Sequence, residues 1–222
     1  MILLPKTISV AARASRLSRA QVQEVLLELR QVDSQVKFTP TFFMTTGDAD
    51  QATSLLTQEG TDFFTKEIDE AVLKGVCRIG IHSAKDLPDE LPSGLATIAY
   101  TKGVDPSDVL VFRTAEDRES LQKNAKVGTS SLRRIENIRA FRDDLVPVDI
   151  RGTIEKRLEL LDSGVVDALV IAKAALIRLQ IQRETMLLPG RGAARQGSLA
   201  VVAKEDDHEM KALFAPLNRF FL

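Results

Sequence analysis

Two periods of apolar residues alternate along the sequence, one typical of strands and the other typical of amphipathic helices. The first pair is a β-rich run at Ile8–Ala11, followed by a helical stripe at Val22, Val25, Leu26 and Leu29. Polar residues, among them Arg13 and Ser15, separate the two. This pattern predicts a strand, a polar turn and then a helix with one buried face.

The same unit recurs further along the chain. A helix is predicted over Phe63–Lys74, closed by Gly75, and a strand follows at Cys77–Ile81. Later strands are predicted at Lys126-Val127, Val146–Ile150, Ala168–Ala172 and Leu199–Ala203, and later buried helix stripes at Leu132, Ile135, Ile138 and Phe141 and at Ile154, Leu158 and Leu161. Strands that alternate with helices favour parallel pairing through crossover helices.

Two loops are candidate crossings between domains. Tyr100–Ser107 contains Gly103 and Pro106, and Pro189–Gly197 is rich in Gly and Arg. We therefore expect residues 1–102 and 198–219 to form a first α/β domain and residues 103–197 to form a second. The predicted fold class is α/β, in which each lobe is a mixed, mostly parallel sheet flanked by helices. Such an arrangement is like that of periplasmic binding proteins and predicts an interlobe cleft.

Composition and charge exclude several classes of function. The 222 residues carry a net charge of −1, so no global basic field indicates nucleic acid as a partner. No apolar stretch approaches the roughly 20 residues of a membrane span, and no export signal is recognised. The single cysteine, Cys77, excludes an intramolecular disulfide. We expect a cytoplasmic protein that contacts neither nucleic acid nor membrane.

Cations and hydroxyls cluster at the predicted strand ends. In open α/β sheets, ligands bind at these ends, where helix N-termini also attract anions. One arginine after a strand is usually a solvated surface residue, but several strand ends share this chemistry, which suits a ligand with several carboxylates or phosphates. The candidate binding residues are Arg13, Ser15, Ser83, Lys85, Thr129, Ser131, Arg133, Arg134 and Arg151, together with the helical Arg157 and Arg178.

Asp86 is the one carboxylate among these residues. It follows Lys85, so a surface ion pair is one interpretation, and a carboxylate that stabilises a developing cation or moves protons is the other. Spacing alone leaves the two evenly matched. His82 and His208 lack partners at metal-ligand spacing, so no metal site is predicted and His82 is expected to be a packing residue.

Several motifs, in order along the chain, resemble those of the porphobilinogen deaminase family, whose enzymes are also called hydroxymethylbilane synthases. The resemblance extends from about Ile8 to Asn218. The matching strings are His82–Pro88 with Glu90–Pro92, Gly128–Arg134, Arg151-Gly152 with Arg157-Leu158, Phe64–Glu67 and Asp105–Asp108.

The resemblance implies a transferase of heme biosynthesis that joins four porphobilinogen units into hydroxymethylbilane, each with loss of ammonia. Asp86 matches the catalytic aspartate, which stabilises the electrophilic azafulvenium that ammonia leaves behind. The candidate binding residues match positions that hold the acetate and propionate groups of the pyrroles. Phe64 matches an aromatic residue beside the pyrrole rings.

The family also implies a dipyrromethane cofactor, joined through a thioether to a cysteine of a third domain. We expect that domain and that cysteine to be absent from this chain. Cys77 should be buried on the same side of its strand as Ile79 and Ile81, where it would not carry the cofactor. Gly190–Arg195 is also longer than the family's turn before Gln196-Gly197.

Two other functions remain open. One is a non-catalytic binder of pyrroles or other polycarboxylates, which keeps the arginines but turns over nothing. The other, from analogy of fold alone, is a solute-binding module of the periplasmic type. Porphobilinogen as a small-molecule substrate is the prediction that the motifs favour.

Overall fold

The computed structural model describes residues 7–50 and 61–218. These form two compact units. Among the described residues, the first unit holds 7–49, 61–103 and 198–218, and the second holds 50 and 104–197. Each unit is described by itself below.

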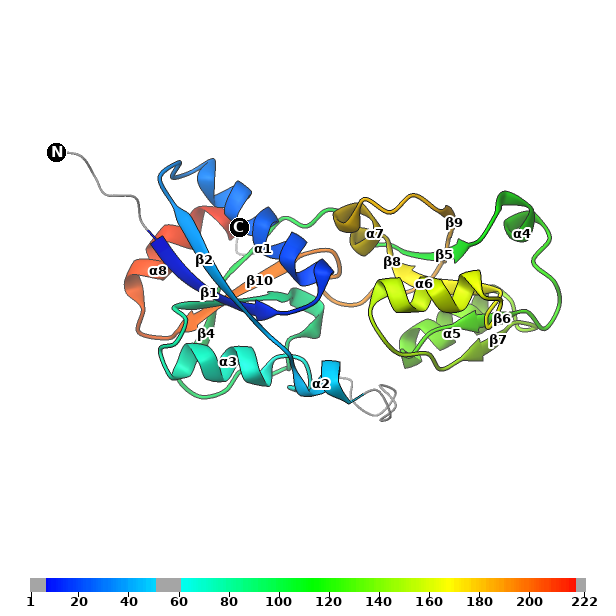
Figure 1. Ribbon diagram of the computed structural model, residues 1–222, viewed down its shortest axis with the longest axis horizontal. Coiled ribbons are helices and arrows are strands. Elements are labelled where there is room, and N and C mark those ends of the chain that lie inside the picture. The colour runs from blue at the N-terminus through cyan, green and yellow to red at the C-terminus, as the bar shows by residue number, and fades with distance from the viewer. Residues whose placement is uncertain (1–6, 51–60, 219–222) are drawn as a thin grey trace. The chain divides into compact units, whose positions relative to one another are not determined.

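The first unit is built on a five-stranded sheet in the order β2-β1-β3-β10-β4 (Figure 1). Its strands are β1 (Thr7–Arg13), β2 (Lys37–Phe43), β3 (Ile79–Ser83), β4 (Leu95–Tyr100) and β10 (Leu199–Lys204). β1 is parallel to β2 and β3, whereas β10 is antiparallel to β3 and β4. The strand that is last in sequence therefore lies inside the sheet.

Helices cover both faces of this sheet. The helices are α1 (Arg16–Arg30), α2 (Thr46–Ala49), α3 (Lys66–Leu73) and α8 (His208–Phe214), with short 3₁₀ turns at Ala84–Asp86 and Ala215–Leu217. The predicted stripe of α1 is buried and shares one core cluster with Phe214 of α8 and with Ile79 and Ile81. α3 covers the other face, where Ile68 packs beside Cys77.

Cys77 is buried, as predicted, but on the opposite face from Ile79 and Ile81. The expected alternation fails because β3 begins only at Ile79, so Cys77 lies in a bend before the strand. Burial raises the pKa of its thiol. Since a thiolate is the reactive form of cysteine, this position disfavours thioether chemistry.

The second unit repeats the architecture with the order β7-β6-β8-β5-β9. Its strands are β5 (Asp108–Phe112), β6 (Lys126–Gly128), β7 (Val146–Val148), β8 (Ala168–Ala172) and β9 (Glu184–Leu187). β6 is parallel to β7 and β8, and β5 is antiparallel to β8 and β9. Each unit is thus a mixed sheet flanked by helices, which is the predicted fold class, with parallel and antiparallel pairings in equal number.

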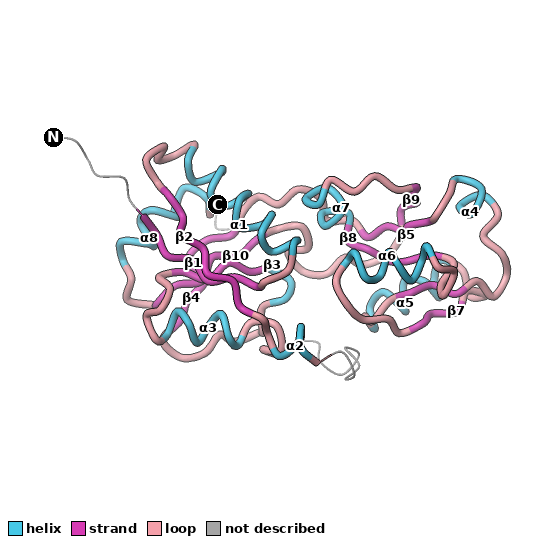
Figure 2. The backbone as a smooth tube through the Cα atoms, in the orientation of Figure 1, coloured by secondary structure: helices cyan, strands magenta, loops and turns pink. Residues whose placement is uncertain are grey.

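The helices of the second unit are α4 (Ala115–Glu119), α5 (Leu132–Phe141), α6 (Ile154–Asp162) and α7 (Lys173–Leu179) (Figure 2). Ile138 of α5 is fully buried against the sheet, and Leu158 and Leu161 bury α6 beside β8. Leu132 is 47% exposed, so its predicted place in the buried stripe was wrong. As the first residue of α5, it precedes the turn at which the helix reaches the sheet.

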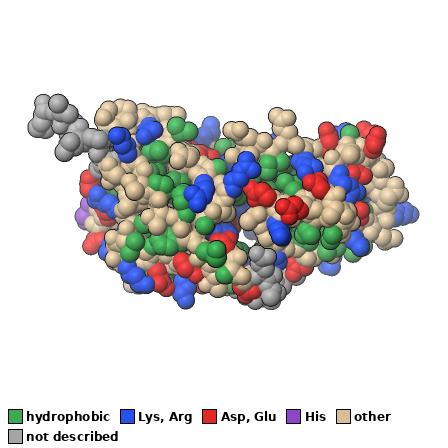
Figure 3. All heavy atoms as spheres, in the orientation of Figure 1, with side chains coloured by type: hydrophobic (Ala, Val, Ile, Leu, Met, Phe, Trp, Pro, Cys, Tyr) green, Lys and Arg blue, Asp and Glu red, His purple; other side chains and the backbone are tan. Residues whose placement is uncertain are grey.

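The surface bears no single-sign field on the face that Figure 3 shows, where acidic and basic side chains are interspersed. This agrees with the net charge of −1. Attraction for an anion must therefore come from local groups.

No helix within residues 7–50 and 61–218 combines the length and apolarity that a membrane crossing requires.

Candidate active site

In the first unit, two of the predicted binding residues come together around a carboxylate. Arg13 is the last residue of β1, and its Nε and Nη2 donate to Asp48 Oδ2 and Oδ1 at 3.3 and 2.5 Å. The Arg13 guanidinium carbon also lies 4.3 Å from the centre of the Phe64 ring, in cation–π contact. The sequence analysis did not identify Asp48, although a half-buried guanidinium needs a partner for its charge.

Asp48 is held as an anion. Burial acts to raise the pKa of Asp48, but the hydrogen bond and charge of Arg13 and two hydrogen bonds from Thr45 outweigh burial and lower it below 3.8. The Thr45 hydroxyl donates to Oδ2 at 2.8 Å and the Thr45 amide at 3.2 Å. The carboxylate therefore positions the Arg13 guanidinium on the Phe64 ring.

The Arg13–Asp48 pair should make stability depend on acid. Because the folded pKa of Asp48 lies below its unfolded value, the stabilisation is present above about pH 4 and is lost as pH falls through the folded pKa. We expect Asp48→Asn to cost about 1–2 kcal/mol of unfolding free energy at pH 7 and much less at pH 3. Urea unfolding at both pH values measures this. A cost equal at both, or matched by exposed Asp206→Asn, would contradict it.

Two serines lie at strand and helix ends of the same unit. Ser15 caps α1, its Oγ accepting from the Ser18 amide at 3.1 Å. Ser83 ends β3, and its Oγ accepts from Gln21 Nε2 at 2.8 Å. Since each oxygen accepts, each hydroxyl proton can still be donated to a ligand.

Asp86 lies in the 3₁₀ turn that follows β3. The turn is tied to the chain before β10, because the Ala84 amide donates to the Ser198 carbonyl at 3.0 Å. Asp86 is half-buried, and no hydrogen bond or ion pair joins its side chain to any residue within 7–50 and 61–218. The surface ion pair with Lys85, one of its two interpretations, is not formed.

Behind β3, His82 faces Asp69 of α3. Both side chains are buried, with Nε2 3.3 Å from Asp69 Oδ1. This contact is one of packing beneath the sheet. Within the described part of the chain, no three His, Cys, Asp or Glu side chains are grouped as metal ligands.

In the second unit, the turn Gly128–Ser131 leads from β6 into α5. Thr129 is fully buried, and its Oγ1 accepts from the Ser131 amide at 3.4 Å. The Ser130 hydroxyl donates to the Ile150 carbonyl. Ser131 is half-exposed at the N-cap of α5. The buried Thr129 and Ser130 thus hold the turn in shape, and Ser131 is the one of the three whose side chain is partly exposed to solvent.

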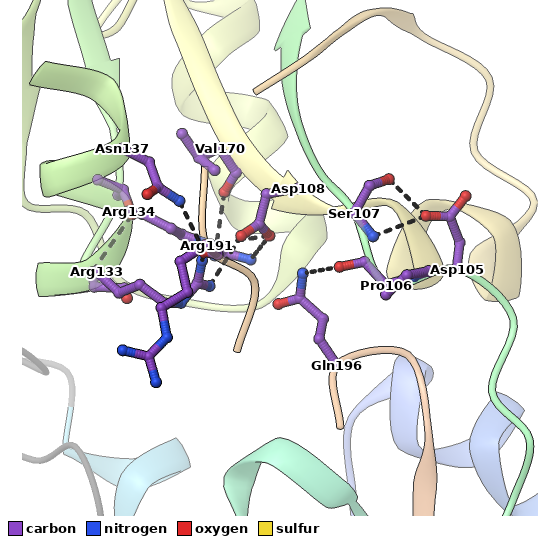
Figure 4. Close-up of polar contacts among 12 residues, drawn as sticks. Asp105, Pro106, Ser107, Asp108, Arg133, Arg134, Asn137, Val170, Arg191 and Gln196 are labelled. Atoms are coloured by element: carbon purple, nitrogen blue, oxygen red, sulfur yellow. Dashed lines mark hydrogen bonds and ion pairs between the residues drawn. The ribbon is translucent and has the colours of Figure 1, made fainter. Parts of the chain in front are cut away.

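Arg133 and Arg134 share one carboxylate, Asp108 of β5 (Figure 4). Arg134 Nη2 is 2.6 Å from Asp108 Oδ1, and both residues are buried. Arg133 Nη2 is 2.9 Å from Oδ2, and Arg133 Nη1 donates to the Arg191 carbonyl at 2.6 Å. Arg134 is therefore a buried structural residue of this unit, while the Arg133 side chain is more exposed.

The remaining arginines lie on or near helices of this unit. Arg157 Nε donates to the Gly152 carbonyl at 3.0 Å, and Arg178 Nη2 to the Gly197 carbonyl at 2.7 Å. Arg151 is half-buried just beyond β7. In each of these two contacts a backbone carbonyl orients the guanidinium, which is the group that suits a carboxylate ligand.

The two-unit α/β architecture is that of periplasmic-binding-protein-like folds. A periplasmic substrate-binding protein of an ABC transporter from Coxiella burnetii has a similar structure, with a TM-score of 0.56 and 14% identity over 95% of this chain and 91% of that one. At this identity the likeness concerns the fold alone.

Sequence comparison defines the family. Residues 8–212 match the family model described as "Porphobilinogen deaminase, dipyromethane cofactor binding domain". The chain is 40% identical to a probable porphobilinogen deaminase of Chlamydia pneumoniae, over 96% of this chain and 91% of that protein. It is also 40% identical to a porphobilinogen deaminase of Desulforudis audaxviator, over 96% of this chain and 70% of that protein. The chain belongs to the porphobilinogen deaminase family, whose members are transferases of porphyrin and heme biosynthesis.

The dipyrromethane that the family implies can be tested against these residues. Each of its pyrroles bears an acetate and a propionate, and Ser131, Arg133 and Arg157 offer donors that suit carboxylates. The charge of the group therefore fits the second unit. Its thioether does not fit Cys77, the one cysteine of the sequence, because that thiol is 1% exposed.

Proposed function

We propose that the chain is a porphobilinogen deaminase-type transferase, which condenses porphobilinogen units into hydroxymethylbilane with loss of ammonia. The observation that carries the proposal is the Asp86 carboxylate. It stands in the turn beyond β3 and pairs with no cation among the described residues, although Lys85 is its neighbour. Family membership supplies the reaction, and Asp86 supplies a group able to assist it.

Asp86 would act when ammonia departs. The bond from the methylene carbon to the protonated amino nitrogen breaks, ammonia leaves with the electron pair, and the positive charge passes to the methylene carbon and the pyrrole nitrogen. A carboxylate beside that nitrogen lowers the energy of the cation. The free α-carbon of another pyrrole then attacks the methylene carbon, and loss of the α-proton restores the ring.

The arginines would bind the acetates and propionates of the pyrroles. Arg13, Arg133, Arg157 and Arg178 are held by neighbours, so little side-chain freedom is lost on binding. Phe64 would place an aromatic face beside the rings. The other proposed binding residues are Ser15, Ser83, Lys85, Thr129, Ser131, Arg134 and Arg151; among them, Thr129 and Arg134 would act from buried positions by shaping the turn and α5.

When bound, a dipyrromethane supplies the pyrrole acceptor to which new units are added. In this chain, Ser131, Arg133 and Arg157 would hold its carboxylates. Cys77 has no part in this, because its thiol is buried and its pKa is raised.

The test is incubation of the purified chain with porphobilinogen. We expect porphobilinogen to be consumed and ammonia released, while intact-protein mass spectrometry shows the chain without a two-pyrrole adduct on Cys77. An adduct that maps to Cys77 would refute the exclusion of that thiol as the attachment point. Binding of porphobilinogen without consumption would favour the non-catalytic binder instead.

The cytoplasmic location and the absence of nucleic-acid and membrane partners remain predictions from the sequence. Fractionation of cells that express the chain measures the first. Porphobilinogen is the one ligand that the proposal requires.

A further inference from the structure

The loop Pro189–Gly197, between β9 and β10, has a backbone that is fixed at both ends. Gly190 has φ +127°, and a Cβ there would lie 2.3 Å from Asn137 Oδ1. Gly197 has φ +90°, and a Cβ there would lie 2.5 Å from the Asp105 carbonyl oxygen. A side chain is unfavourable at both positions, because each φ lies in the region that favours glycine and, at Gly197, the Asp105 backbone also fills the space.

Side chains also hold the loop along its length. The Arg191 carbonyl accepts from Arg133 Nη1 at 2.6 Å and from Asn137 Nδ2 at 2.9 Å. Gln196 Nε2 donates to the Pro106 carbonyl at 2.7 Å. Arg133, a proposed binding residue, is thus a direct neighbour of the Arg191 backbone. These contacts fix the backbone at Arg191 and therefore the position of its Cα atom.

The Arg191 side chain, in contrast to the Arg191 carbonyl, does not help to hold the loop. It is exposed, and its guanidinium makes no hydrogen bond or ion pair with any residue that the structure describes. Figure 4 shows it running away from Asp108, to which Arg133 and Arg134 are bound. Arg133 and Arg134 thus share one carboxylate, and the neighbouring Arg191 adds a further positive charge that Asp108 does not offset. A ligand carboxylate would offset that charge.

We propose that Arg191 is a further substrate-binding residue, which takes a carboxylate of the pyrrole ligand beside Arg133. This inference rests on the proposed function. Because the loop backbone is fixed, binding orders the Arg191 side chain and little else, which keeps the entropic cost small. Two arginines whose residues are in direct contact, through Arg133 Nη1 and the Arg191 carbonyl, also suit a ligand whose rings each bear two carboxylates.

The experiment compares Arg191→Ala with Arg139→Ala. Arg139 is an exposed arginine of α5 that is not among the proposed binding residues, and its loss changes the net charge equally. We expect Arg191→Ala to raise KM for porphobilinogen roughly fivefold with kcat within about twofold of wild type. Arg191→Lys should restore part of the loss, and Arg139→Ala should change neither constant. The midpoint of thermal unfolding should stay unchanged in all three.

Equal KM values for Arg191→Ala and Arg139→Ala would overturn the inference while leaving the proposed function intact. If wild type binds porphobilinogen without turnover, the same comparison is made on the dissociation constant by calorimetry. A wild type that neither binds nor consumes porphobilinogen overturns both proposals.

Discussion

Asp86→Asn is expected to lower porphobilinogen turnover by about 10²–10³-fold, since an amide cannot offset the charge left by departing ammonia. Binding should change by less than about threefold, because the carboxylates of the ligand are proposed to contact arginines and hydroxyls. The measurement is steady-state consumption of porphobilinogen, with equilibrium binding measured beside it.

The matched control is Asp89→Asn, an exposed carboxylate that lies just beyond the same turn. It removes the same charge without touching the proposed chemistry, so turnover should stay at the wild-type value. An Asp86→Asn variant as active as Asp89→Asn would remove Asp86 from the mechanism and leave the binder as the better account.

Asp108→Asn is expected to lower the free energy of unfolding by about 3–5 kcal/mol, because it leaves the buried Arg134 guanidinium without its counterion. Both residues are buried, at 4% and 7% exposure, so water cannot replace the lost carboxylate. Urea unfolding measures the cost. The same variant should loosen Arg133, which shares Asp108.

The control for this variant is Asp162→Asn, which removes the partner of Arg183 at a more exposed site. Its cost should stay below about 1 kcal/mol. If Asp108→Asn does not fold, the double variant Asp108→Leu with Arg134→Met should recover folding, since an apolar pair of similar size needs no counterion. A cost no larger than that of Asp162→Asn would show that the buried pair contributes little.

The local pattern of strands and helices was largely readable from the sequence. Ala168–Ala172 was predicted with the bounds that β8 has, because five buried apolar residues leave little ambiguity. Boundaries beside the site were harder. Arg13 and Ser83 prove to be the last residues of β1 and β3 rather than parts of the turns. The strands were predicted from runs of apolar residues, so their polar last residues were not recognised as part of them.

The partners of the site residues could not be read in the same way. Asp48 lies 35 positions from Arg13, and Asp108 lies 26 positions from Arg134. Each pair forms only because the sheet order brings distant segments together. Asp105–Asp108 was noted as a motif, but nothing in its spacing assigned Asp108 to the arginines of α5. Arg191 was seen only as part of a longer loop.

The position of β10 has a consequence for the order in which the chain folds on the ribosome. All five strands of the second sheet lie between residues 108 and 187, so this sheet can be completed as soon as that stretch emerges. The first unit cannot, because β3 and β4 pair with β10 and not with each other. Until residues 199–204 are synthesised, both strands keep an unpaired edge. The segment carrying Asp86 joins these two strands, so it should acquire its native form only after β10 has been synthesised.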